Sequence, residues 1–316
     1  MPPLANEARW SVTPARSVRW RRRRDRLAEY AFIAPALLLL VVVVLFPILT
    51  ALYLSFHNVR LVSPDQAFMG FATAFNGLNN YLEVLANPEF REALLTTFVF
   101  TGLTVIGSFA LGLWLAVLLD SAIKARSFWR ILMLTPWVVA PVVAGATWSW
   151  MFETRYGVFN ALIRTILPSV PPIPWLAQPT LALLAVSLTN VWLRTPFMMV
   201  MLLAGLQAIP LDQYEAAAVD GATAWQRFRF ITIPHLSFVI LVATLLESIW
   251  TFKHFDIVQV MTGGGPGRAT ALLSTLIYKT SFEFFRFGPA SAMGMLMTLV
   301  LLAFAVVYVR LLRSRE

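Results

Sequence analysis

The 316-residue chain contains no cysteine and only three histidines. The lack of cysteine excludes disulfides, thiolate zinc sites and cysteine nucleophiles, and three scattered histidines cannot form a histidine-rich metal cluster. Charge is also scarce, because charged residues make up 13% of the chain and hydrophobic residues 59%. Soluble globular domains are about a quarter charged and about half apolar. This composition excludes an ordinary soluble protein.

Motifs for catalysis and nucleotide binding are missing as well. A P-loop needs Gly, four residues, then Gly-Lys-Ser/Thr. The segment Gly263–Ala269 is rich in glycine but lacks the lysine and the hydroxyl, and Gly102–Gly107 is followed by Ser108 where lysine is required. The chain also has no His-Glu-x-x-His metal site and no Gly-x-Ser-x-Gly elbow. We expect a non-enzyme that holds no cofactor and no metal.

Long uncharged segments are the main feature that is present. A helix of about 20 apolar residues crosses a hydrocarbon core about 30 Å thick. Six segments reach this length, although the fourth contains Arg194 and the fifth contains Glu247, Lys253, His254 and Asp256. They lie at Tyr30–Phe56, Ala93–Leu119, Ile131–Phe152, Thr180–Leu206, Pro234–Met261 and Phe287–Val309. The sequence therefore predicts an all-α membrane protein with six transmembrane helices.

A basic tail, residues 1–29, precedes the transmembrane domain expected at residues 30–316. A basic start is also typical of a secretory signal peptide, but the apolar region of such a peptide is only about 7–15 residues long. The uncharged segment Tyr30–Phe56 is longer, so a retained membrane anchor is favoured.

Lysine and arginine are distributed unevenly between the two sides of the six predicted spans. One side carries 16 of the 25, in the tail, the turn at 121–130, the loop at 207–233 and the C-terminus. Cytoplasmic segments keep an excess of these residues, so both termini are expected in the cytoplasm. Orientation and attraction to anionic lipid explain the net charge of +9, and no nucleic-acid partner is expected.

Two polar connections are expected on the external side, at His57–Glu92 and Glu153–Pro179. Connections longer than about 12–15 residues usually bind a partner or are disordered. An external partner and a partly ordered surface cap both remain possible for these segments.

The cytoplasmic loop at 207–233 is neither apolar enough to cross the membrane nor composed like a flexible linker. Pro210 and Asp212 suit the first turn of a helix, Glu215–Ala218 are strong helix formers, and Gly221 can adopt the left-handed conformation that ends one. The sequence predicts a short helix that ends at a glycine hinge.

A second helix is expected at Ala222–Phe230. Trp225, Phe228 and Ile231 recur at three-residue spacing, which gives the segment an apolar face. Composition alone leaves two interpretations open, an isolated helix at the membrane interface and a compact projection that another protein can push.

The residues of this loop resemble the EAA signature of the membrane subunits of ATP-binding-cassette importers. The matching positions are Glu215, Ala216, Ala217, Gly221, Ile231, Ile233 and Pro234, with Ile233 standing where leucine is commoner. The extended form found in sugar importers is matched further by Asp220, Ala222 and Phe228.

A second stretch, Thr262–Pro266, resembles the MalF-like branch of the carbohydrate permeases, together with Phe255-Asp256 before it and Tyr278, Phe282, Gly288 and Ala292 after it. The resemblance extends from Tyr30 to Arg310. It implies the type I importer permease fold, a second MalG-like permease subunit, two ATP-binding subunits and an extracytoplasmic substrate-binding protein. ATP would be bound by those partner subunits.

The same resemblance implies that the loop at 207–233 is a coupling helix that docks on a partner ATPase. Glu215 would hold the loop by polar contacts, Gly221 would make the bend, and Asp220 would cap the second helix. The residues expected to take part in coupling are Glu215, Ala216, Ala217, Asp220, Gly221, Ala222 and Phe228.

Polar and aromatic residues in the fourth and fifth spans are candidates for the substrate path, because ionisable groups inside a membrane are costly and often functional. Aromatic faces suit a sugar ring and polar groups suit its hydroxyls. The candidates are Asn190, Trp192, Arg194, Glu247 and Trp250. Tryptophans also suit interfacial belts, where Trp148 and Trp150 are expected. Lys253 and Asp256 are expected to pair or to reach water.

The sequence thus favours a permease subunit that carries a sugar or related carbohydrate into the cytoplasm. Two alternatives stay open: an importer of another solute such as glycerol phosphate, and a membrane-embedded enzyme acting on lipid.

Overall fold

The computed structural model describes residues 33–59, 74–121 and 124–313. These ranges consist of helices and their connections and contain no β-strand, which confirms the expected all-α class. The basic tail at 1–29 and Tyr30 lie outside the described residues, so the division into a tail and a permease domain stays a prediction.

The chain divides into two compact units, residues 1–53 and 54–316. In the first unit, the described residues belong to a helix that runs from Ile33 to Ser55 and includes a π-helical segment, η1 (Val41–Leu45), and α2 (Phe46–Ser55). Every side chain from Ile33 to Leu49 is exposed, and none is charged. Such a surface is stable in lipid rather than in water.

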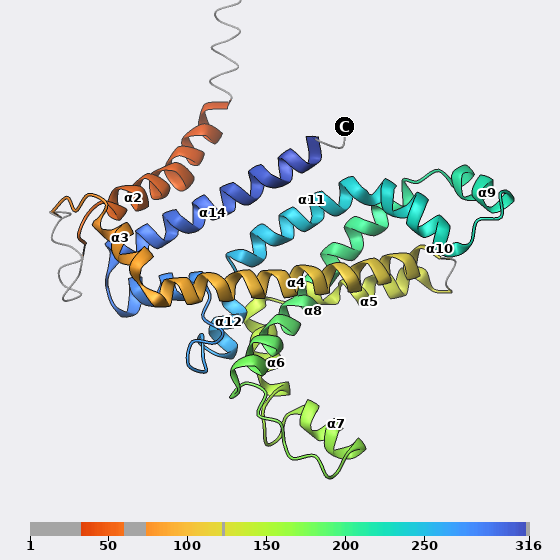
Figure 1. Cartoon of the computed structure of the whole chain (residues 1–316), viewed down its shortest axis with the longest axis horizontal. Coiled ribbons are helices and arrows are strands. Elements are labelled where there is room, and N and C mark those ends of the chain that lie inside the picture. Colours follow the sequence, from red (N-terminus) through yellow and green to blue (C-terminus); the bar gives the residue numbers. More distant parts are fainter. Residues whose placement is uncertain (1–32, 60–73, 122–123, 314–316) are drawn as a thin grey trace, which may run out of the picture. The chain divides into compact units, whose positions relative to one another are not determined.

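The second unit contains the remaining helices (Figure 1). Its first half comprises α3 (Asn79–Ala86), α4 (Pro88–Asp120), α5 (Arg126–Val138), α6 (Pro141–Met151), α7 (Val158–Ile166) and α8 (Pro179–Gln207). Its second half comprises α9 (Leu211–Val219), α10 (Ala224–Arg227), η3 (Phe228–Thr232), α11 (Ile233–Phe252), α12 (Asp256–Met261), α13 (Leu273–Tyr278), η4 (Lys279–Glu283) and α14 (Phe287–Arg313).

Five helices in the described ranges are long and apolar enough to cross a membrane, and a bent helix pair raises the number to six when it is counted as one span. The spans predicted at Thr180–Leu206 and Phe287–Val309 coincide with α8 and α14. The second begins earlier than predicted, because Pro88 occupies the first turn and the Asn87 side chain accepts a hydrogen bond from the Glu89 N–H at 2.9 Å.

The prediction of one continuous helix at Ile131–Phe152 is wrong. α5 and α6 meet at an angle of 96°. Pro136 lies inside α5 and Pro141 begins α6, and the residue before Pro141, Ala140, is extended with φ −60° and ψ 135°. Proline removes a helical hydrogen bond and disfavours the helical conformation in the residue before it. The apolar pattern is therefore divided between two short helices.

The fifth predicted span, Pro234–Met261, is also misplaced. The long helix begins at Ala224 and ends at Phe252, and Asp256–Met261 forms the separate helix α12. The break falls at Lys253 and His254, where the uncharged sequence is interrupted. The amphipathic helix predicted at Ala222–Phe230 and the fifth span are thus one helical rod.

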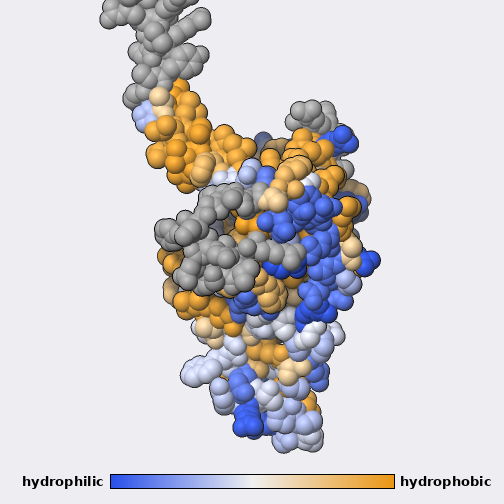
Figure 2. All heavy atoms as spheres, turned by 90° about the vertical axis from the view of Figure 1, so that its left-hand side faces the viewer, coloured by the Kyte–Doolittle hydropathy of each residue, from blue (hydrophilic) through white to orange (hydrophobic). Residues whose placement is uncertain are grey.

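In its middle part, α4 directs a row of hydroxyl side chains toward the protein and several apolar side chains away from it. Leu95 and Ile106 are 66% and 69% exposed, and apolar residues cover much of the visible surface of the molecule (Figure 2). The hydroxyl groups that face inward are those of Thr97, Thr101, Thr104 and Ser108, all of which are buried. Helix interfaces in membranes are enriched in small and polar residues, which let helices approach closely and form hydrogen bonds to one another.

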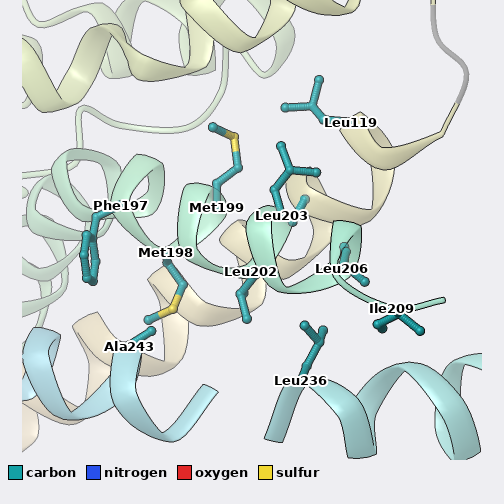
Figure 3. Close-up of a cluster of buried hydrophobic side chains, with 11 residues drawn as sticks. Leu119, Phe197, Met198, Met199, Leu202, Leu203, Leu206, Ile209, Leu236 and Ala243 are labelled. Atoms are coloured by element: carbon teal, nitrogen blue, oxygen red, sulfur yellow. The ribbon is translucent and has the colours of Figure 1, made fainter. Parts of the chain in front are cut away.

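α4 and α8 form the most extensive helix pair among the described residues. A cluster of buried side chains lies beside it (Figure 3). Met198 points from α8 toward Ala243 of α11, whereas Met199 points to the other side of α8. Leu236 of α11 packs into the same cluster. This cluster joins the three helices near the end of α8 that leads into the loop at 207–233.

We expect Gly112→Ala to destabilise the chain. A Cβ atom at Gly112 would lie 2.8 Å from the Met198 Cβ and 3.0 Å from the Met199 backbone nitrogen, so the helices must move apart. Overpacking of this kind costs about 1–3 kcal/mol. Gly102→Ala in the same helix is the control, because its Cβ has no neighbour within 4 Å. Thermal unfolding in detergent checks this, and equal melting temperatures would contradict it.

Candidate functional site

The loop at 207–233 begins with the helix predicted from the sequence. Pro210 is the residue before α9, and Asp212 lies in its first turn. The helix ends in a Schellman motif, in which the Gly221 N–H donates to the Ala218 carbonyl at 3.1 Å and the Ala222 N–H to the Ala217 carbonyl at 2.8 Å. Gly221 has φ +79°, which confirms its left-handed conformation.

The cap of the second helix differs from the expectation. Asp220 is the C-terminal cap residue of α9 and does not cap α10. Thr223 does so: its side chain accepts a hydrogen bond from the Gln226 N–H, and the Gln226 side chain accepts one from the Thr223 N–H at 2.7 Å. A hydroxyl residue three positions before glutamine is the capping-box pattern, so the sequence contained the signal.

The loop is held against the long helix that follows it. The hydroxyls of Tyr214 in α9 and Thr232 in η3 are hydrogen-bonded at 2.8 Å. Beyond this contact the loop is open to solvent, because Glu215 and Ala216 are exposed and Ala217 is half-buried. Large apolar side chains are exposed as well, namely Leu211, Val219, Trp225 and Phe230. Exposed large apolar side chains that lie near one another in the chain suit a protein interaction site.

A concavity of about 340 Å³ lies between the end of α9 and the start of the next helix. Its wall includes five residues of the motif. The complete lining is Ala217, Asp220, Gly221, Ala222, Gln226, Arg227, Phe230 and Ile231. Phe228 does not line this concavity; its ring packs 5.7 Å from that of Trp225.

A second cavity, of about 460 Å³, contains two of the five residues predicted for the substrate path, Arg194 and Trp250. The Arg194 guanidinium carbon lies 5.7 Å from the centre of the Trp250 ring, a cation–π arrangement. The rest of the lining is Trp137, Lys253, His254, Phe255 and Asp256. Lys253 and Asp256 therefore face a cavity, and no ion pair joins them in the described part of the chain.

Asn190 and Glu247 are fully buried and line neither cavity described above. The Asn190 side-chain amide donates to the Thr104 hydroxyl at 3.4 Å, and the Ser108 hydroxyl donates to Glu247. These two hydrogen bonds tie α8 and α11 to the polar face of α4. Both residues hold the helices that carry Arg194 and Trp250 and do not themselves face the cavity.

Trp192 lies apart from Arg194 and Trp250. Together with Trp114, Trp129 and Trp148, it lines a third cavity of about 740 Å³, which is almost wholly apolar. The structure thus separates Trp192 from the polar cavity. The sequence reasoning also missed Trp137 and Phe255 as cavity residues. Trp137 could have been suspected from its place next to Pro136, where α5 is interrupted.

Two residues that line the polar cavity have a buried polar atom without a hydrogen-bond partner among the described residues. These atoms are the Nε of Arg194 and the Nε2 of His254. Most buried polar groups in proteins are paired. Arg194 and His254, which line the cavity, can therefore direct polar groups toward a ligand that enters it.

Comparison with known proteins gives the family. Residues 59–316 match the model of the family described as binding-protein-dependent transport system inner membrane component. The chain belongs to this family. It is therefore a subunit of a membrane transport system and a multi-pass membrane protein.

Two curated relatives match nearly the whole chain. The trehalose/maltose transport system permease protein MalF of Thermococcus litoralis is 37% identical over 293 residues, which cover 93% of this chain and 96% of that protein. The sulfoquinovosyl glycerol transport system permease protein SmoG of Agrobacterium fabrum is 35% identical, with 95% of each chain covered.

A solved structure has the same fold. It belongs to a bacterial ATP-binding-cassette transporter involved in the import of the acidic polysaccharide alginate. The two chains superpose with a TM-score of 0.78 at 20% sequence identity, and the match covers 93% of this chain and 98% of that chain. The predicted importer permease fold is confirmed.

We expect Thr223→Ala to loosen the start of α10. Loss of an N-cap hydroxyl costs about 1 kcal/mol, which corresponds to roughly fivefold faster exchange of the capped amide when exchange follows local opening. Hydrogen exchange at the Gln226 amide in the purified chain checks this. Thr223→Ser keeps the hydroxyl and is the control; identical exchange in both variants would contradict the capping role.

Proposed function

We propose that this chain is the permease subunit of an ATP-binding-cassette importer that moves a sugar or related carbohydrate into the cytoplasm. The observation that carries the proposal is the combination of an exposed loop with the EAA pattern and a polar, tryptophan-lined cavity in one family member. The relatives MalF and SmoG, named for transport of sugars or a sugar glycoside, support the choice of solute.

In this proposal the loop at 207–233 docks on a partner ATPase. Ala216 and Ala217 present a surface without bulky side chains beside Glu215, and the concavity next to Gly221 can receive a side chain of the partner. ATP is bound and hydrolysed by two partner subunits, and this chain itself catalyses no reaction. A second, MalG-like permease subunit and an extracytoplasmic substrate-binding protein complete the importer.

The orientation in this proposal follows the charge distribution. The loop at 207–233 and both termini lie in the cytoplasm, since that side carries most of the lysine and arginine residues. The polar cavity then lies toward the outer half of the membrane, because Lys253 and Asp256 follow the far end of the rod that begins in the cytoplasm at Ala224. The solute would enter from that side.

The cavity also supports a second candidate solute. Arg194 and Lys253 line the same wall, and two cations suit a solute that bears an anion, such as glycerol phosphate. Trp137 and Trp250 in the same cavity provide the aromatic faces that a sugar ring needs. We favour a carbohydrate and keep the phosphate-bearing solute as the alternative. An enzyme acting on lipid is not proposed, since the chain belongs to a family of transport components.

The coupling role predicts that Gly221→Val abolishes most ATP-driven uptake. A β-branched residue at φ +79° is strongly strained, although a Cβ atom there meets no neighbour within 4 Å. We expect at least a tenfold loss of uptake in proteoliposomes containing all subunits. Gly221→Asn is the matched control, because asparagine tolerates the left-handed conformation, and it should keep most of the activity. Full uptake by Gly221→Val would refute the role of the bend.

The substrate path predicts that Arg194→Gln lowers uptake of the transported carbohydrate roughly ten- to hundredfold, the effect of losing one hydrogen bond from a charged group. Arg91→Gln, which removes an exposed guanidinium of α4 outside the cavity, is the control and should leave uptake unchanged. Radiolabelled trehalose, a sulfonated sugar glycoside and glycerol phosphate are compared. Transport of glycerol phosphate alone would select the alternative solute.

A further inference from the structure

The short helix α7 lies in the connection between α6 and α8, and its surface is divided by chemistry. Val158, Leu162 and Ile166 are four residues apart and so share one face, and they are 48%, 56% and 76% exposed. Asn160 on the opposite side is buried, and Phe159 packs against the aromatic cluster beneath. The helix thus presents an uncovered apolar stripe.

Hydrogen bonds and ring contacts on the opposite side of α7 keep this stripe exposed. The Asn160 amide nitrogen donates to the carbonyls of Thr154 and Ile173 at 3.0 and 2.9 Å, and its oxygen accepts from the Ile173 N–H and the Trp175 indole. The rings of Phe152 and Phe159 stack at 4.6 Å. α7 therefore cannot turn its apolar face inward without breaking these contacts.

The depth of α7 in the membrane follows from its attachment to α8. The aromatic cluster under α7 includes Trp148, which lies 5.6 Å from Trp192. Trp192 stands about 20 Å along α8 from Pro179, and the 29-residue helix is about 43 Å long. Trp148 thus contacts the middle of a helix that is longer than the hydrocarbon core of about 30 Å.

The α7 residues Phe159 and Asn160 contact Ile173 and Trp175, just before α8 begins. α7 is therefore attached beside the first part of α8, and a helix about 43 Å long ends at the headgroup level, because a bilayer with its headgroups is about 40–45 Å thick.

The 96° bend between α5 and α6 accounts for this placement. α5 has 13 residues and rises about 20 Å from the end of the bundle where the loop at 207–233 lies. α6 leaves at nearly a right angle to α5 and adds little to the rise along α5 before α7 begins. In the orientation proposed above, this depth corresponds to the outer leaflet.

The residues around the stripe match the outer interface of a bilayer. Trp150 and Tyr156 are 69% and 63% exposed and form an edge-to-face pair at 6.3 Å. Trp and Tyr with one polar atom are typical of the headgroup level. Arg155 and Arg164 are both exposed. In Figure 2, which views the molecule from the left-hand side of Figure 1, the lower end of the molecule is mostly pale to blue.

We propose that α7 is an interfacial helix whose Val158, Leu162 and Ile166 side chains lie among the acyl chains of the outer leaflet. Trp150 and Tyr156 lie at the headgroup level, and Arg155 and Arg164 face the lipid phosphates. The partner of this surface is thus phospholipid, and the connection at 153–179 is a membrane-seated element. The assignment to the outer leaflet depends on the orientation given under the proposed function. The contact between α7 and lipid does not depend on that orientation.

The absence of cysteine from this chain makes a direct test possible, because a single introduced cysteine is its only thiol and can be labelled before the chain is assembled with its partners. Leu162→Cys and Ile166→Cys carry a small fluorophore in the complete importer, placed in phospholipid nanodiscs. Arg164→Cys on the same helix, away from the stripe, is the matched control. Quenching is measured with nitroxide groups on the lipid acyl chains and with iodide in the buffer, each with and without the substrate-binding protein.

We expect acyl-chain nitroxides to quench the probes at 162 and 166 at least threefold more than the probe at 164, and iodide to show the reverse order. Addition of the binding protein should change neither the nitroxide quenching nor the iodide quenching. Strong iodide quenching at 162 and 166 that disappears only when the binding protein is added would overturn the proposal and assign the stripe to that protein. Strong iodide quenching in both conditions would overturn it too. Neither result depends on uptake, so the transport proposal is tested separately.

Discussion

The close approach of α4 and α8 is the contact on which the rest of the second unit depends. Lipid supplies no hydrophobic force between helices, so packing and hydrogen bonds must hold them together. Gly107 and Gly112 make this possible, because a Cβ at either position would collide with Val191 or Met198. The pair fixes one side of α8, and that helix then places Arg194 in the polar cavity.

Polar side chains inside the bundle also hold α4, α8 and α11 together. The links from Thr104 to Asn190 and from Ser108 to Glu247 lie on the inward face of α4, where an unpaired group would be costly. They hold α8 and α11 at a fixed separation, across which Arg194 meets the Trp250 ring. Of the residues predicted for the substrate path, Arg194 and Trp250 line the cavity, Asn190 and Glu247 keep its walls in place, and Trp192 lines the separate apolar cavity.

Long uncharged segments and capping patterns were sufficient to predict the class, most spans and the helix that ends at Gly221, because these features are local. The sequence could not show that Trp192 lies apart from Trp250, since they belong to different helices whose rotation depends on packing. The interruption between Pro136 and Pro141 and the Thr223 capping box were local signals that a search for apolar length overlooked. The attachment of α7 beside the start of α8 shows only in tertiary contacts, those of Asn160 and Phe159 with Ile173 and Trp175.

Continuity between the loop and the fifth span gives the proposed coupling a physical basis. The rod Ala224–Phe252 has 29 residues and is about 43 Å long, and no loop interrupts it between the capped start at Thr223 and Trp250 at the cavity. The hydrogen bond between Tyr214 and Thr232 attaches α9 to this rod. A force applied to α9 therefore reaches the rod near its first turns, and a rigid rotation there moves the cavity wall at the other end. A flexible connection in place of Thr223 and η3 would absorb the same force.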